Sequence, residues 1–245
     1  MLNLSGAGAN GIGLIKTFPA GAFAKLRKSP KKSSRTRGTS PPQKSPKARE
    51  ALLAAALRVF ARDGYDGASI PKIAKTARVA APLIHYYFGS KENLWRESVA
   101  HSLGDLRREA LSIGNATRAL APLQRLRVFL QTLTQHAARW PDNFVMIIAE
   151  ARSESDRFAW VQENYTGVIF QELLSMLQDA KDTKAIREVD IDQLAFLLVG
   201  GMLVYFTVNP KISNNTDPKY LDRIAGEYTD LMFELLVEGI SRKTR

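Results

Sequence analysis

Residues 85–91 carry the side chains of this chain best suited to contact a nucleic acid. His85, Tyr86 and Tyr87 lie in a row, and Lys91 follows four residues after the last of them. Imidazole, phenol and ammonium groups bind phosphate oxygens and base edges through charge, hydrogen bonds and stacking. This cluster is therefore a candidate for contacts to a nucleic acid.

Two short helices joined by a tight turn must position this cluster. The first covers roughly 70–77, with Ser69 as its expected N-cap, and the second covers roughly 81–86. Ser90 is the expected cap of a longer third helix, because its hydroxyl can accept from a free backbone N–H. Helix, short turn and helix is the architecture that lays a helix into the DNA major groove.

The other positions of this unit divide between surface and core. Ala81 and Pro82 lie at the end of the second helix that faces base edges, where they offer only apolar contact. Ile84 and Phe88 fit core positions, and Lys72 is a further candidate for a phosphate contact. The alternative for the aromatic trio is that one ring packs inward while the others are merely exposed. For the lysines it is a solvated surface position.

Most of the net positive charge lies in an N-terminal tail. The chain has 245 residues, 35 basic and 24 acidic side chains and a net charge of +11, and residues 1–47 hold ten of the basic side chains and no acid. Residues 48–245 therefore carry 25 basic and 24 acidic side chains and are nearly neutral. Residues 1–46 have the composition of a disordered tail. It either adds non-specific phosphate contacts or is a solvated extension, and a transit peptide would have a similar composition.

The rest of the sequence predicts an all-α fold. Apolar residues recur at helical spacing, and no run alternates with period two. The apolar run 194–208 is shorter than the roughly 20 residues of a membrane span, so we expect it to be buried and expect no membrane association. Helices are expected at roughly 46–62, 90–112, 120–139, 142–152, 156–181, 190–208 and 217–241.

The sequence holds no recognisable catalytic or metal-binding set. There is no cysteine, and His85, His101 and His136 fall on different predicted helices. No nucleophile elbow and no glycine-rich phosphate loop within a βαβ unit appears. We therefore expect no enzyme activity, no catalytic residues, no metal site and no cofactor.

Residues 47–107 resemble the TetR-type (tetracycline-repressor-like) regulators. The resemblance rests on LAAALRVFARDGYDGASIPKIAKTARVAAPLIHYYFGSKENLW, and its core is HYYFGSKENLW. Residues 118–245 match only in length, helix count and an apolar, glycine-containing penultimate helix. The resemblance implies a cytoplasmic homodimer with a helix-turn-helix DNA-binding domain at 47–107, after the tail at 1–46. It implies a ligand-binding and dimerisation domain at 108–245.

The resemblance also implies roles for single residues. Family members contact DNA through aromatic residues and a lysine at the positions of the 85–87 trio and Lys91. The partner is a palindromic double-stranded operator, and a small ligand of unknown identity releases the repressor. Arg78 departs from the usual glycine or asparagine, and a positive φ there would cost about 1 kcal/mol. The predicted DNA contacts are Ser69, Lys72, Arg78, Ala81, Pro82, His85, Tyr86, Tyr87 and Lys91.

The ligand pocket is predicted only from the position of the central helices. Large aromatic side chains and methionine there either line a cavity, as in this family, or form ordinary core. Arg152 would favour an anionic ligand if it were buried without an acidic partner. The predicted ligand contacts are Trp140, Phe144, Met146, Arg152, Trp160, Tyr165 and Phe170.

Two functions from different classes remain open. One is a ligand-responsive repressor, and the other is an interaction protein whose tail binds nucleic acid or acidic surfaces non-specifically. Operator binding that survives loss of residues 1–46 would favour the repressor.

Overall fold

The computed structural model of the chain describes residues 46–153, 155–237 and 239. These residues form helices and no β-strand, which confirms the expected all-α fold. The predicted tail lies outside the described residues except for Pro46, as do most of the last residues of the final predicted helix. The described residues fall within one compact unit.

The helices agree closely with the predicted ones. The short α10 was not predicted, and a π-helical segment, Gln162–Thr166, joins α7 and α8 into one continuous helix. The helices are α1 (Pro46–Gly67), α2 (Ile70–Ala77), α3 (Pro82–Phe88), α4 (Lys91–Ala116), α5 (Pro122–Arg139), α6 (Pro141–Ser153), α7 (Asp156–Val161), α8 (Gly167–Asp182), α9 (Ile191–Val208), α10 (Pro210–Ser213) and α11 (Pro218–Met232). A second π-helical segment, Phe233–Val237, follows α11.

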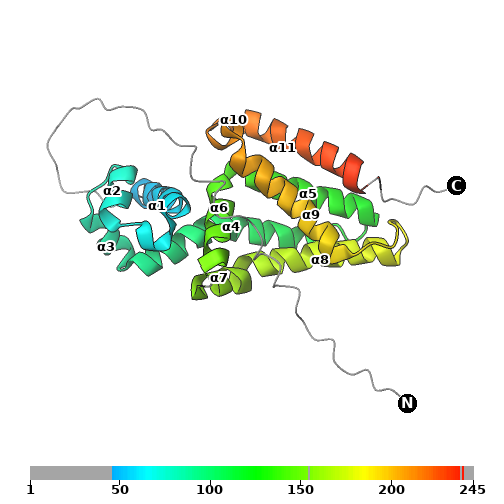
Figure 1. Cartoon of the computed structure of the whole chain (residues 1–245), viewed down its shortest axis with the longest axis horizontal. Coiled ribbons are helices and arrows are strands. Elements are labelled where there is room, and N and C mark those ends of the chain that lie inside the picture. The colour runs from blue at the N-terminus through cyan, green and yellow to red at the C-terminus, as the bar shows by residue number, and fades with distance from the viewer. Residues whose placement is uncertain (1–45, 154, 238, 240–245) are drawn as a thin grey trace, which may run out of the picture. The chain divides into compact units, whose positions relative to one another are not determined.

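Helices α1, α2 and α3 lie together at one end, and α4 runs from there into the group formed by α5, α8, α9 and α11 (Figure 1). Leu53, Leu57 and Phe60 recur on one face of α1 and are almost fully buried. Ile84 and Phe88 of α3 are buried in the same apolar core, as predicted. Burying these side chains holds α3 in place and leaves its other face exposed.

The ends of α2 and the start of α4 test the predicted turn and caps. Arg78 has φ 60° and ψ 39°, so the arginine does adopt the left-handed conformation, and its N–H bonds to the carbonyls of Ala74 and Lys75. Ser90 Oγ accepts from Asn93 N at 3.0 Å, which confirms this cap. Ser69 is the N-cap residue of α2 by position, but in the described structure its side chain makes no capping hydrogen bond, so that prediction was wrong.

Aromatic rings connect the α1–α3 end to the helical body. Gly64 has φ 71° and kinks α1, so that Tyr65 folds back and stacks on Phe60 with ring centroids 5.8 Å apart. Tyr65 also meets the edge of Trp95 in α4, and Trp95 packs on Trp160 of α7 at 5.7 Å. An aromatic cluster with Phe60 and Trp95 at its buried side therefore spans α1, α4 and α7.

The π-helical turn at Gln162–Thr166 requires a glycine after it. A Cβ on Gly167 would lie 2.5 Å from the Gln162 carbonyl oxygen, so any other residue would clash with backbone. The Asn164 side-chain amide donates to the Trp160 carbonyl at 2.8 Å and satisfies an acceptor within this wider turn. Turns of this kind are rare and occur disproportionately at functional sites.

Helix α9 leaves an apolar face uncovered. Leu194, Leu198 and Met202 are buried, whereas Leu197 is 55% exposed, and Val204 and Val208 are exposed on the same side. By length and composition α9 could also cross a membrane, with 22% of its residues buried. The buried part packs against α5, α6 and α8 as a member of the bundle. The exposed part of α9 is an apolar surface that no described residue covers.

Candidate DNA-binding site

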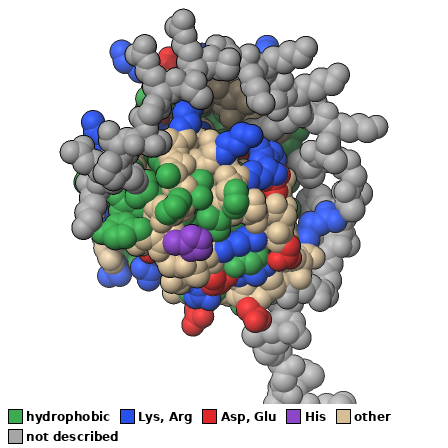
Figure 2. Space-filling view, turned by 90° about the vertical axis from the view of Figure 1, so that its left-hand side faces the viewer, with side chains coloured by type: hydrophobic (Ala, Val, Ile, Leu, Met, Phe, Trp, Pro, Cys, Tyr) green, Lys and Arg blue, Asp and Glu red, His purple; other side chains and the backbone are tan. Residues whose placement is uncertain are grey.

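The end of the molecule formed by α1–α3 is the candidate DNA-binding face. Figure 2 views this end and shows apolar side chains near its centre, with Lys and Arg side chains around them and a few acidic side chains at the lower edge. The N-terminal residues of α3 lie on the surface, where Pro82 is exposed and Ala81 is half-buried. A DNA-facing helix needs such an accessible end.

The three aromatic residues of α3 differ in exposure. Tyr86 is 60% exposed, and His85 is also exposed. His85 Nδ1 donates to the Gly89 carbonyl at 3.3 Å, which leaves Nε2 for another partner. Tyr87 is half-buried beside Tyr86 and Phe88, and its shielded hydroxyl has no hydrogen-bond partner among the described residues. His85 and Tyr86 are therefore the more accessible pair.

The lysines of this face are held by neighbouring groups. Lys72 Nζ lies 2.8 Å from Asp63 Oδ2. Hydrogen bonds from Arg62, and then from Lys72, lower the pKa of Asp63 to about 2. Because this carboxylate holds Lys72, the lysine is less available to a phosphate than the sequence suggested. Lys91 has no acidic partner within 4 Å in the described structure, and its Nζ lies 4.4 Å from the centre of the Tyr65 ring.

Two further predicted contacts lie on the same face. Ser69 and Arg78 are exposed at the two ends of α2. No ion pair within 4 Å joins Arg78 to a described acidic residue, so its guanidinium remains available for a phosphate. These positions, like the others on this face, stay predictions of DNA contact.

Tyr65 makes contacts with two cations that were not predicted from the sequence. The Lys91 ammonium group lies over the Tyr65 ring. The guanidinium group of Arg157, in α7, also lies over this ring, with Cζ 3.8 Å from the ring centre. Burial, followed by the nearby Glu92 carboxylate, raises the pKa of Tyr65 above its usual value. No local pattern signals such a contact, because it joins residues 26 and 92 positions apart in the chain.

The predicted ligand contacts pack mostly against other side chains. Trp160 meets Trp95 and Tyr165, and Phe170 meets Phe196. Phe144 lies against His136, Trp140 lies against His101, and Met146 is buried in the core. Arg152 is exposed on α6, so the condition for an anion site there is not met. The set as a ligand site stays a prediction.

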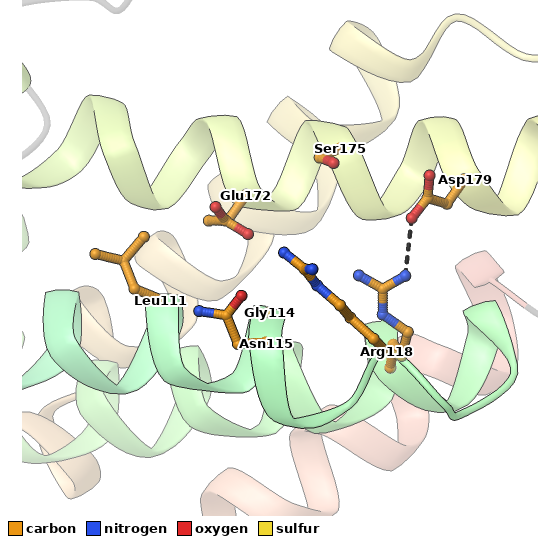
Figure 3. Close-up of a pocket in the computed structure, with 8 residues that line it drawn as sticks. Leu111, Gly114, Asn115, Arg118, Glu172, Ser175 and Asp179 are labelled. Atoms are coloured by element: carbon orange, nitrogen blue, oxygen red, sulfur yellow. Dashed lines mark hydrogen bonds and ion pairs between the residues drawn. The ribbon is translucent and has the colours of Figure 1, made fainter.

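A different part of the helical body contains a polar cavity of about 380 Å³. Figure 3 shows Arg118, in the turn after α4, extending toward Glu172 of α8. Arg125 Nη1 lies 2.8 Å from Asp179 Oδ2. Arg125 Nε is buried without a partner in the described structure. None of the seven predicted ligand contacts lines it. The lining residues are Leu111, Gly114, Asn115, Arg118, Arg125, Glu172, Ser175 and Asp179.

A buried imidazole lies between α5 and α6. His136 is 9% exposed, and Asn143 Nδ2 donates to its Nε2 at 3.1 Å. Burial, with a smaller contribution from Arg139, lowers the pKa of His136 to about 4. The described residues contain no group of three or more His, Asp or Glu placed to hold a metal ion.

The α1–α4 region is similar in sequence to known regulatory proteins. Residues 52–97 match the model of the bacterial regulatory proteins of the tetR family. The HTH-type transcriptional regulator BetI of Agrobacterium fabrum is 36% identical over 116 residues, which are 46% of this chain and 55% of BetI. The alignments with BetI proteins span about half of their length.

Two longer alignments extend into the helical body. The HTH-type transcriptional repressor NicS of Pseudomonas putida is 25% identical over 170 residues, which cover 68% of this chain and 79% of NicS. The structure of the ketosteroid transcriptional regulator KstR2 of Mycobacterium tuberculosis has a TM-score of 0.63 over 85% of this chain and all of that one. At 18% identity this similarity shows a common fold. These matches place the helix-turn-helix formed by α2 and α3 within a region that is similar to the bacterial regulatory proteins of the tetR family, and they show that the helical body shares the fold of such a regulator.

Proposed function

We propose that this protein is a sequence-specific DNA-binding regulator of transcription. The α2–α3 unit carries the proposal, because it lies within the family match and keeps the outer face of α3 exposed. Pro82, His85 and Tyr86 would face the major groove, and Arg78 and Lys91 would contact phosphates. The apolar N-terminal end of α3 supports a readout that depends on backbone contacts and DNA shape.

The protein acts in the cytoplasm as a repressor that a small molecule releases from its operator. Repression is the activity named for its relative NicS. Residues 47–107 bind DNA, and residues 108–245 provide the effector site and the dimer contact. The polar cavity between α4 and α8 offers one place for an effector that carries charged or hydrogen-bonding groups. The aromatic residues of the central helices offer another.

The uncovered face of α9 supports a homodimer. Leu197, Val204 and Val208 are spaced as on one side of a helix, and Gly201 is exposed between the first two. No described heavy atom lies within 4 Å of a Cβ placed on Gly200. Leu231 and Leu235, in α11 and the segment after it, are exposed as well. Such apolar surface on a soluble bundle marks an interface, and a two-fold dimer matches a palindromic operator.

Selection of bound DNA from a random pool tests the proposed function. We expect the full chain and residues 46–245 to enrich the same palindromic sequence, because the specific contacts lie within the described unit. A screen of metabolites on the enriched complex then searches for the effector. If residues 46–245 bind no DNA while the full chain binds without sequence preference, the tail is responsible and the repressor proposal is wrong.

Replacing Lys91 by alanine tests the phosphate contact. We expect Lys91→Ala to weaken binding to all sequences about equally and to reduce the salt slope by about one unit, since one phosphate contact is lost. Fluorescence anisotropy at several salt concentrations measures both quantities. Lys211→Ala, on the short α10, is the control and should change neither. An unchanged slope in Lys91→Ala would refute the contact.

A further inference from the structure

Tyr65 lies where the α1–α3 end and the helical body meet. Its ring stacks on Phe60 and meets the edge of Trp95, so its orientation is fixed by two large buried neighbours. It follows the kink at Gly64 and lies outside the α2–α3 unit. The ring is therefore a rigid platform to which groups from other helices can bind.

Two cationic side chains from different helices lie over the Tyr65 ring. Lys91 Nζ, at the start of α4, lies 4.4 Å from the ring centre, and Arg157 Cζ, in α7, lies 3.8 Å from it. A cation over an aromatic face is attracted by the ring quadrupole. Two cations on one ring also repel each other, so a change at either one alters the environment of the other.

Arg157 is anchored in the helical body. Its Nε lies 3.0 Å from Glu150 Oε2, and Ser155 Oγ donates to the same oxygen at 2.6 Å. Glu150, near the end of α6, is 3% exposed. A buried carboxylate requires its partner, so Arg157 follows the corner between α6 and α7 when that corner moves.

We propose that Arg157 is a positioning residue that acts through Tyr65 on Lys91, so that the α6–α7 corner sets how well this lysine meets an operator phosphate. The inference rests on the proposed function, because it requires Lys91 to contact DNA. It adds a defined route, from Glu150 through Arg157 and Tyr65 to Lys91, by which the helical body regulates DNA binding.

A double-mutant cycle on the full chain tests the route. Arg157→Leu is combined with Glu150→Gln, so that no charged carboxylate remains buried without a partner. We expect this pair of changes to weaken operator binding about tenfold and to reduce the salt slope by about one unit, as Lys91→Ala does. Adding Lys91→Ala to the pair should cost little more, because both remove the same contact. Losses that multiply to about a hundredfold would overturn the inference.

Two substitutions of Tyr65 and a control substitution of another arginine complete the test. Tyr65→Phe keeps the ring and should bind operator as the unchanged protein does, whereas Tyr65→Leu should reproduce the loss. Arg96→Leu is the control, since Arg96 lies over Trp160 at 4.9 Å in the same junction but not over Tyr65. It should leave the salt slope unchanged, and a smaller slope would overturn the inference. All variants are compared at a temperature where their circular dichroism shows them folded.

The outcomes separate the inference from the proposed function. If the unchanged protein binds no operator, the proposed function fails. If it binds and the Arg157 and Glu150 changes leave both affinity and salt slope intact, only the route through Tyr65 is wrong.

Discussion

Leu197→Asp is expected to convert a dimer into a monomer. The Leu197 side chain is 55% exposed on the apolar α9 face, so a two-fold interface through this face would place the introduced carboxylates in an apolar contact. Operator affinity should then fall about a hundredfold or more, because the second half-site is no longer bound by a linked domain. Sedimentation at micromolar concentration measures the first effect, and fluorescence anisotropy on the selected operator measures the second.

The matched control places the same charge on a different exposed leucine. Leu120, in the connection before α5, is 42% exposed and lies outside the α9 face. Leu120→Asp should therefore remain a dimer with unchanged operator affinity. A Leu197→Asp protein that still sediments as a dimer would show that α9 is not the interface.

Lowering the pH should destabilise the fold through His136. Its pKa is about 4 in the folded protein, against an ordinary value of 6.5. Below pH 6.5 the unfolded chain therefore binds a proton that the folded protein does not, and stability falls until the pH reaches about 4. The loss amounts to about 3 kcal/mol at pH 4, from about 1.4 kcal/mol per unit of pKa difference. The neutral ring also accepts from Asn143, a bond that protonation of Nε2 would break.

Urea unfolding at pH 7.5 and pH 4 checks this effect. Other groups titrate in the same range, so the useful quantity is the difference between the unchanged protein and His136→Gln. The unfolding free energy of the unchanged protein should fall about 3 kcal/mol more than that of the variant. His101→Gln removes an exposed imidazole instead and serves as the control. Equal falls in the two proteins would show that His136 is not the group responsible.

The parts of the structure that depend on local sequence were predictable. Periodic apolar residues located the main helices. The resemblance marked Arg78 as a position where φ could be positive, and φ is 60° there. Ser90 caps α4 as expected. Ser69 does not cap α2 with its side chain, although its residue type and its place before the helix are as favourable as those of Ser90.

The contacts between distant parts of the chain were not predictable in this way. Lys72 and Lys91 look alike in the sequence, yet one pairs with Asp63 and the other lies over Tyr65. Tyr87 seemed equivalent to its two neighbours, but its hydroxyl is turned inward. Each difference depends on which elements pack together. The order of residue types along one chain does not determine these contacts.

The π-helical turn before Gly167 fixes how α7 is rotated relative to α8, which matters for related proteins that lack this turn. Val161 and Ile169 are both buried, although eight residues along a regular α-helix would turn about 80° beyond two full turns. The extra residue of the π turn brings them back into phase. A single codon thus sets the rotation of α7, which carries Arg157, relative to α8. A descendant that lost this codon would keep both helices but turn Arg157 about 100° away from Tyr65.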